Sequence, residues 1–142
     1  MFNFLKNLFW SSKINLDKEF NLLKERNNKT KELKNDLEKI NNRIIETKKI
    51  EYQYFETEKI LKMDKIDNKT KNAAEKILSL YRGQLIFIEL QKYYLILKYK
   101  SNLNNNDALW LKTYEKAELL FKVNIDDAME IYYHLYDTMN QQ

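Results

Sequence analysis

The chain of 142 residues contains no cysteine, no proline and a single glycine. Without cysteine it forms no disulfide and no metal site built on thiolate ligands. Folds that need many tight turns or several residues at positive φ, such as β-sandwiches, barrels and glycine-rich phosphate loops, are nearly excluded. What remains is an all-α protein, and its hydrophobic fraction of 44% is enough for a sizeable core.

The chain is also rich in Asn, Lys, Ile, Tyr and Phe, the residues whose codons contain mainly A and T. An AT-rich genome would reduce proline and glycine in any fold. The missing proline is therefore weak support for helices by itself, and the spacing of the apolar residues has to carry the prediction.

The excess of positive charge is small. Lys and Arg number 25 against 21 Asp and Glu, which gives a net charge of +4. Only Arg26, Arg43 and Arg82 carry the guanidinium group that reads phosphates and bases in a bidentate way. Acidic residues alternate with the lysines between Lys18 and Lys65, which favours a solvated, ion-paired helix surface over a phosphate-binding track.

Residues 1–13 form an amphipathic pattern on a helix, with lysine and asparagine opposite a continuous apolar face. That face consists of Phe2, Phe4, Leu5, Leu8, Phe9 and Trp10. It is either an anchor to a membrane surface or a partner protein, or a helix folded back on the protein's own core. The segment is too short to span a bilayer and lacks the pattern of a secretory signal. We therefore expect an intracellular protein, cytoplasmic or organellar, with peripheral membrane attachment as an alternative.

Residues 14–66 carry the clearest signal, a coiled-coil-like alternation of four-residue and three-residue spacings between apolar positions. Asn27 and Thr30 weaken this pattern, which then resumes. A continuous helix here would be about 70 Å long, more than the rest of so short a chain can cover. We expect it to pair with a later helix, a second copy or a foreign helix. The predicted partner interface consists of Leu33, Leu37, Ile40, Ile44, Tyr52 and Tyr54.

Residues 67–142 are predicted to form a small helical bundle that ends in a helical hairpin. The apolar pattern lapses over residues 63–72, where we expect a turn with Asp67 among the possible N-caps, an unbroken helix being the alternative. Residues 73–100 are apolar almost all round, which is typical of a buried central helix.

Two short helices follow, with Asp107 and Asp126 as their predicted N-caps. Their apolar faces are Trp110, Leu111, Tyr114, Ala117 and Phe121 in the first, and Ala128, Ile131, Tyr132, Leu135 and Met139 in the second.

The sequence contains few residues of the types that catalyse reactions. The single histidine, His134, shares a helical stripe with Asp127, Glu130 and Asp137, and such a stripe could hold a divalent metal. The same stripe is simply the polar back of the last amphipathic helix, so a solvated face is the favoured interpretation. We therefore predict no catalytic residue, no cofactor, no metal and no enzymatic activity.

These features favour a non-enzymatic helical scaffold or accessory subunit that mediates protein–protein assembly in a larger complex. Its partner would be another protein, or a second copy bound through the long helix. The alternatives are a peripheral membrane protein docked through residues 1–13 and a subunit that binds nucleic acid or ribonucleoprotein along the lysine-rich helix, the last being less favoured.

Overall fold

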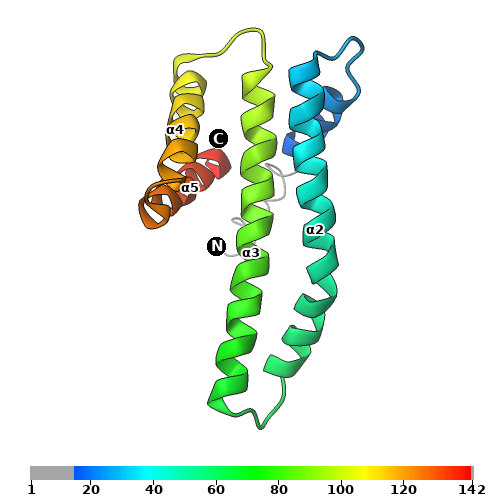
Figure 1. The fold of residues 1–142 in the computed structure, drawn as a ribbon, viewed down its shortest axis with the longest axis vertical. Coiled ribbons are helices and arrows are strands. Elements are labelled where there is room, and N and C mark those ends of the chain that lie inside the picture. The colour runs from blue at the N-terminus through cyan, green and yellow to red at the C-terminus, as the bar shows by residue number, and fades with distance from the viewer. Residues whose placement is uncertain (1–14, 142) are drawn as a thin grey trace. The chain divides into compact units, whose positions relative to one another are not determined.

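The computed structural model of the chain describes residues 15–141, in which all regular elements are helices and no strand occurs (Figure 1). The predicted all-α class is therefore confirmed. A helix at residues 15–24 precedes α2 (Lys31–Leu61), α3 (Asn68–Lys98), α4 (Asn105–Phe121) and α5 (Ile125–Asn140). The amphipathic segment 1–13 lies outside the described residues.

The stretch 14–66 does not form one continuous helix. Residues 25–30 are not helical, and Asn28 adopts a positive φ of 59° within them. Asparagine tolerates this left-handed conformation better than most residues, so neither glycine nor proline is needed for the break. Thr30 then begins α2, because its Oγ1 accepts a hydrogen bond of 3.1 Å from the amide nitrogen of Leu33.

The described residues divide into two compact units. Unit 1 comprises residues 15–37 and 89–141, and unit 2 comprises Glu38–Ile88. Both α2 and α3 contribute residues to each unit.

Unit 2 is a hairpin in which residues 38–61 of α2 lie antiparallel to residues 68–88 of α3 (Figure 1). The predicted turn is present at residues 62–67. Asp67 caps α3, because its Oδ1 accepts a 2.7 Å hydrogen bond from the amide nitrogen of Thr70, and this bond lowers the pKa of the Asp67 carboxyl. The two helices make contact through the stacked rings of Tyr54 and Tyr81, whose centroids lie 4.5 Å apart.

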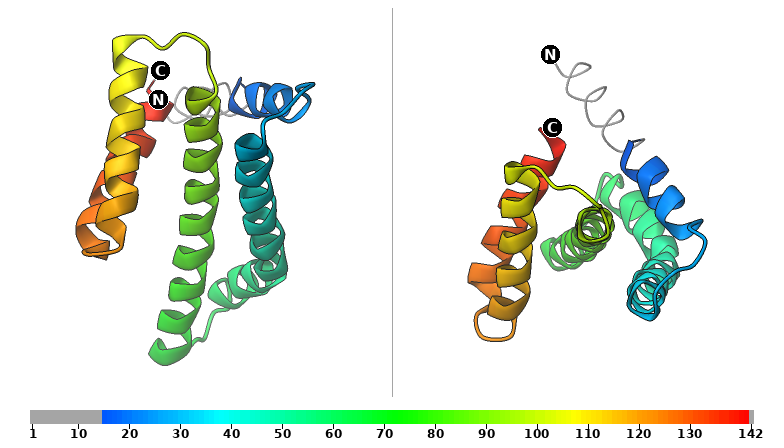
Figure 2. Two further views of the ribbon diagram at one scale, coloured as in Figure 1. Left: turned by 45° about the horizontal axis from the view of Figure 1, so that its top comes forward. Right: turned by 90° about the horizontal axis from the view of Figure 1, so that it is seen from above.

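Unit 1 contains the hairpin of α4 and α5, which lie side by side in both views of Figure 2. Its core is aromatic: the ring of Tyr114 stacks on that of Tyr94 with centroids 4.4 Å apart, and Trp110 meets Tyr93 edge-on. The indole nitrogen of Trp110 donates a 3.1 Å hydrogen bond to the carbonyl oxygen of Leu135, which ties α4 to α5.

The two C-terminal helices use the predicted apolar faces, although their N-caps differ from the prediction. The buried members of these faces are Trp110, Tyr114, Ala117, Ala128, Tyr132, Leu135 and Met139. Asn104 caps α4 instead of Asp107, and Asn124 caps α5 instead of Asp126. In each case the asparagine side chain accepts from the amide of the residue three positions later, so each helix starts earlier than predicted.

Candidate functional site

The six residues of the predicted partner interface do not share one free surface. Leu33 and Ile40 are each only 3% exposed, so both are core residues of the chain. Leu37, Ile44 and Tyr54 are half-buried, whereas Tyr52 is 72% exposed.

The exposed side of α2 in unit 2 carries apolar residues that the predicted stripe does not include. Ile45 and Phe55 are 47% and 52% exposed and accompany Tyr52. At 3.6 residues per turn, Ile45 and Tyr52 differ by only about 20° around the helix, and Thr47, which faces α3, lies about 160° from Ile45. We call this surface the outer face of α2. It comprises Ile45, Lys48, Lys49, Tyr52, Phe55, Glu56 and Lys59.

The seven-residue spacing between Ile45 and Tyr52 was a sequence signal for this face. It was missed because a stronger four-and-three pattern runs along the other side of the same helix. Phe55 lies three positions beyond Tyr52 and continues the outer face.

The predicted burial of α3 holds in one unit and is wrong in the other. Leu90, Leu95 and Leu97 are buried in unit 1. In unit 2, Leu80 is 60% exposed and Leu85 is 40% exposed, because one partner helix covers only one side of an all-round apolar helix. Unit 2 therefore leaves apolar side chains of both α2 and α3 exposed to solvent.

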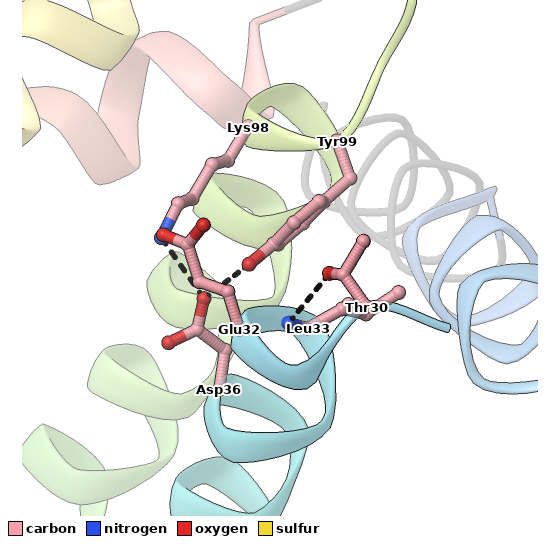
Figure 3. Close-up of polar contacts among 6 residues, drawn as sticks. All are labelled: Thr30, Glu32, Leu33, Asp36, Lys98 and Tyr99. Atoms are coloured by element: carbon pink, nitrogen blue, oxygen red, sulfur yellow. Dashed lines mark hydrogen bonds and ion pairs between the residues drawn. The ribbon is translucent and has the colours of Figure 1, made fainter. Parts of the chain in front are cut away.

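A polar cluster in unit 1 joins the start of α2 to the end of α3 (Figure 3). Lys98 Nζ lies 2.8 Å from Glu32 Oε1 and 2.9 Å from Asp36 Oδ2, and Tyr99 OH donates a 2.6 Å hydrogen bond to the same Asp36 oxygen. Burial lowers the pKa of Lys98, but the bonds to Glu32 and Asp36 outweigh burial and raise it overall. The lysine therefore stays charged, and the cluster acts as a clamp between helices.

The tyrosine of this clamp is also held in its neutral form. Burial and the neighbouring Asp36 carboxylate raise the pKa of Tyr99 to about 12. A neutral phenol that donates to a carboxylate and a charged lysine between two carboxylates hold the start of α2 against the end of α3.

A cavity of ≈ 390 Å³ lies within unit 1. Its wall comes from the helix at residues 15–24, from α3 and the residues after it, and from both helices of the C-terminal hairpin. Asp107 contributes a carboxylate whose side chain is only 10% exposed. Tyr93 OH donates to Asp107 Oδ1 over 3.5 Å, and Lys100 Nζ lies 3.9 Å from Oδ2, so both contacts are long.

Glu89 provides a second acidic group of this wall. Tyr136 OH donates a 3.0 Å hydrogen bond to Glu89 Oε2. Burial and the charge of Glu89 raise the pKa of Tyr136 to about 12, which keeps this phenol neutral as well. The cavity thus combines acidic acceptors with apolar walls.

The acidic and histidine stripe on α5 is exposed to solvent. Asp127 belongs to the start of α5, where Asn124 Nδ2 donates a 2.8 Å hydrogen bond to Asp127 Oδ2. Within residues 15–141, no group of three or more His, Cys, Asp or Glu side chains is placed to hold a metal ion. A membrane-crossing helix is likewise absent from this part of the chain, since none is long and apolar enough.

Comparisons of the chain with protein-family models, curated proteins and solved structures find no significant match.

Proposed function

We propose that the protein is a non-enzymatic helical scaffold or accessory subunit whose unit 2 binds a helix of a partner protein. The observation that carries this proposal is the composition of unit 2, a hairpin of two helices with large apolar side chains open on both. Those more than a third exposed are Ile45, Tyr52, Phe55, Met63, Ile77, Leu80 and Leu85. A soluble two-helix hairpin gains stability when a third helix covers such residues.

The outer face of α2 defines the chemistry of that third helix. Ile45, Tyr52 and Phe55 supply an apolar strip with a large aromatic content, which is typical of the centre of an interface. Around this strip lie three lysines, Lys48, Lys49 and Lys59, and a single glutamate, Glu56. The complementary partner is an amphipathic helix whose apolar stripe is bordered by acidic residues.

The lysines of the outer face can pair with acidic residues of such a partner at little cost in stability. Lys59 Nζ lies 3.4 Å from Glu56 Oε1, but both side chains are largely exposed, and an exposed pair of this kind contributes little. If Lys59 leaves Glu56 and pairs with a carboxylate of the partner, the stability of the chain therefore changes little. The new ion pair fixes the register of the partner helix.

The test compares two surfaces that each carry exposed apolar side chains. Proteins from the native source are captured with three forms of the chain. These are the natural full-length chain, the double variant Ile45→Ser with Tyr52→Ser, and the control variant Leu119→Ser with Val123→Ser. Leu119 and Val123 are exposed residues at the end of the α4–α5 hairpin in unit 1. We expect one protein to be retained by the natural chain and the control and to be reduced at least ~10-fold with the α2 double variant.

Chemical crosslinking then identifies the contact. The proposal requires crosslinks from Lys48 or Lys59 to an acidic-bordered amphipathic helix of the retained protein. Equal retention by the α2 double variant would refute it. So would sedimentation of the purified chain as a dimer that the double variant dissociates, because a second copy would then occupy the face.

A further inference from the structure

The cavity of unit 1 has the dimensions and composition of a site for a small molecule. Its volume of ≈ 390 Å³ falls within the range of about 300–1,000 Å³ that is usual for ligand pockets. Three separate parts of the unit contribute to it, so its shape depends on the tertiary structure and not on one loop. The feature is independent of unit 2 and of the proposed partner helix.

Charge in the cavity wall selects a cation. Glu19, Glu89 and Asp107 bring three carboxylates, and Lys100 is the one basic residue among the lining residues of the described chain. Asp107 is the most informative of these groups, since its side chain is nine-tenths buried and its contacts with Tyr93 and Lys100 are both long. A buried carboxylate has capacity for several donors, and an ammonium group provides three.

The remaining wall indicates the rest of the ligand. Apolar side chains and the ring of Tyr93 line the same space, which suits a hydrocarbon body and a cation near an aromatic face. Asn140 also lines it. Its side chain interacts with the Tyr136 phenol and lowers the pKa of that group, but the buried Nδ2 makes no hydrogen bond of good geometry within the described residues. A buried donor of this kind requires an acceptor oxygen.

We propose that this cavity binds a small organic amine that has an apolar body and a hydroxyl or carbonyl oxygen. The acidic groups of the wall hold the ammonium group, and the Asn140 amide donates to the oxygen. Lys100 competes with the ligand for Asp107, because both offer an ammonium group to the same carboxylate.

Calorimetry with three related compounds tests the ligand class. Leucinol has an ammonium group, a hydroxyl and a branched hydrocarbon body, whereas isoamylamine lacks the hydroxyl and isoamyl alcohol lacks the ammonium group. We expect the full-length protein to bind leucinol saturably with a dissociation constant of about 0.1–1 mM. Isoamylamine should bind about 3-fold to 10-fold more weakly, and isoamyl alcohol at least ~10-fold more weakly.

Substitutions then locate the site and separate binding from folding. Asp107→Asn should weaken leucinol binding about 10-fold, and Glu19→Gln, at an exposed position that tolerates change, about 3-fold. Lys100→Met should strengthen binding about 3-fold, an effect that damage to the fold would not produce. Asp127→Asn on α5, outside the cavity, is the matched control and should leave binding unchanged. No saturable heat with leucinol, or equal affinity for isoamyl alcohol, would overturn the proposal.

Discussion

Unit 1 and unit 2 are built from parts of the same two long helices, yet they bury their side chains differently. In unit 1, Leu90, Trp110 and Tyr114 are almost completely covered, because α3 is joined there by the α4–α5 hairpin and the helix at residues 15–24. In unit 2, the buried positions of α2 include Thr47 and Thr57, and α3 contributes the small Ala74 alongside Leu78 and Ile88.

The number of covering helices, and not the hydrophobicity of a segment, therefore decides which apolar side chains are buried. The same helix α3 is a core element in unit 1 and a half-covered element in unit 2. Two helices share a single contact face, so each apolar side chain beyond that face stays exposed unless another element covers it. This is why unit 2 is the better candidate for binding a partner.

The largest expected effect is the loss of an aromatic anchor in unit 1. Trp110→Ala removes a buried indole and leaves the Leu135 carbonyl without its indole donor. We expect the free energy of unfolding to fall by about 3–5 kcal/mol. Urea unfolding measures this, and Leu109→Ala, at the exposed neighbouring position, is the control with a change below about 0.5 kcal/mol. A loss under about 1 kcal/mol for Trp110→Ala would show that unit 1 does not have the core described above.

A smaller effect is expected at the clamp between α2 and α3 in unit 1. Asp36→Asn removes one of the two carboxylates that hold Lys98 and weakens the acceptor of Tyr99. Both members of the Lys98–Asp36 pair are mainly buried, so we expect a loss of about 1–2 kcal/mol in the free energy of unfolding. Glu38→Gln on the exposed side of α2 is the control. Equal stability of the two variants would mean that the clamp contributes nothing.

Alkaline pH should also weaken unit 1 through Tyr136. Its pKa is about 12 in the folded protein against 10.0 for the free side chain, so the stabilisation is complete below about pH 10 and is lost as the pH rises towards 12. We expect the free energy of unfolding to fall by an amount on the order of 1 kcal/mol across this window.

The matched comparison for this pH effect uses two tyrosines of α5. Tyr136→Phe should flatten the alkaline fall measured by urea unfolding, whereas Tyr133→Phe, at an exposed position, should leave it in place. An alkaline profile that is the same in both variants would assign the effect to other groups, such as Lys98 and Tyr99, whose pKa values are also raised.

The sequence predicts those parts of the fold that depend on local spacing. The all-α class, the turn before α3 and the faces of α4 and α5 follow from the period of the apolar residues. The break at Asn28 was harder to predict, since asparagine in a polar stretch leaves a continuous helix equally acceptable. The shift of the N-caps to Asn104 and Asn124 has a similar cause, because asparagine and aspartate cap helices equally well.

The candidate sites were less accessible to sequence reasoning because they depend on contacts between distant residues. Asp107 meets Tyr93 and lies in one cavity wall with Glu19, which is far away in the sequence. No spacing rule brings these positions together. The outer face of α2 is an intermediate case, since its Ile45 and Tyr52 spacing is visible in the sequence, but its exposure depends on where α3 packs.

The smallest expected effect concerns Gly83 in α3, within unit 2. A methyl group added at this position would meet no atom within 4 Å apart from its chain neighbours and the nearby backbone of its own helix, so the glycine serves no close approach of helices inside the described chain. Gly83→Ala should raise the free energy of unfolding by about 0.5–1 kcal/mol, because alanine restricts the unfolded chain and favours the helix. Hydrogen exchange should show the gain in amides of unit 2, with Lys76→Arg, at an exposed position of the same helix, as the control. If Gly83→Ala instead reduces binding of the partner helix while it stabilises the hairpin, this position lies at the contact, which would extend the docking surface from α2 to α3.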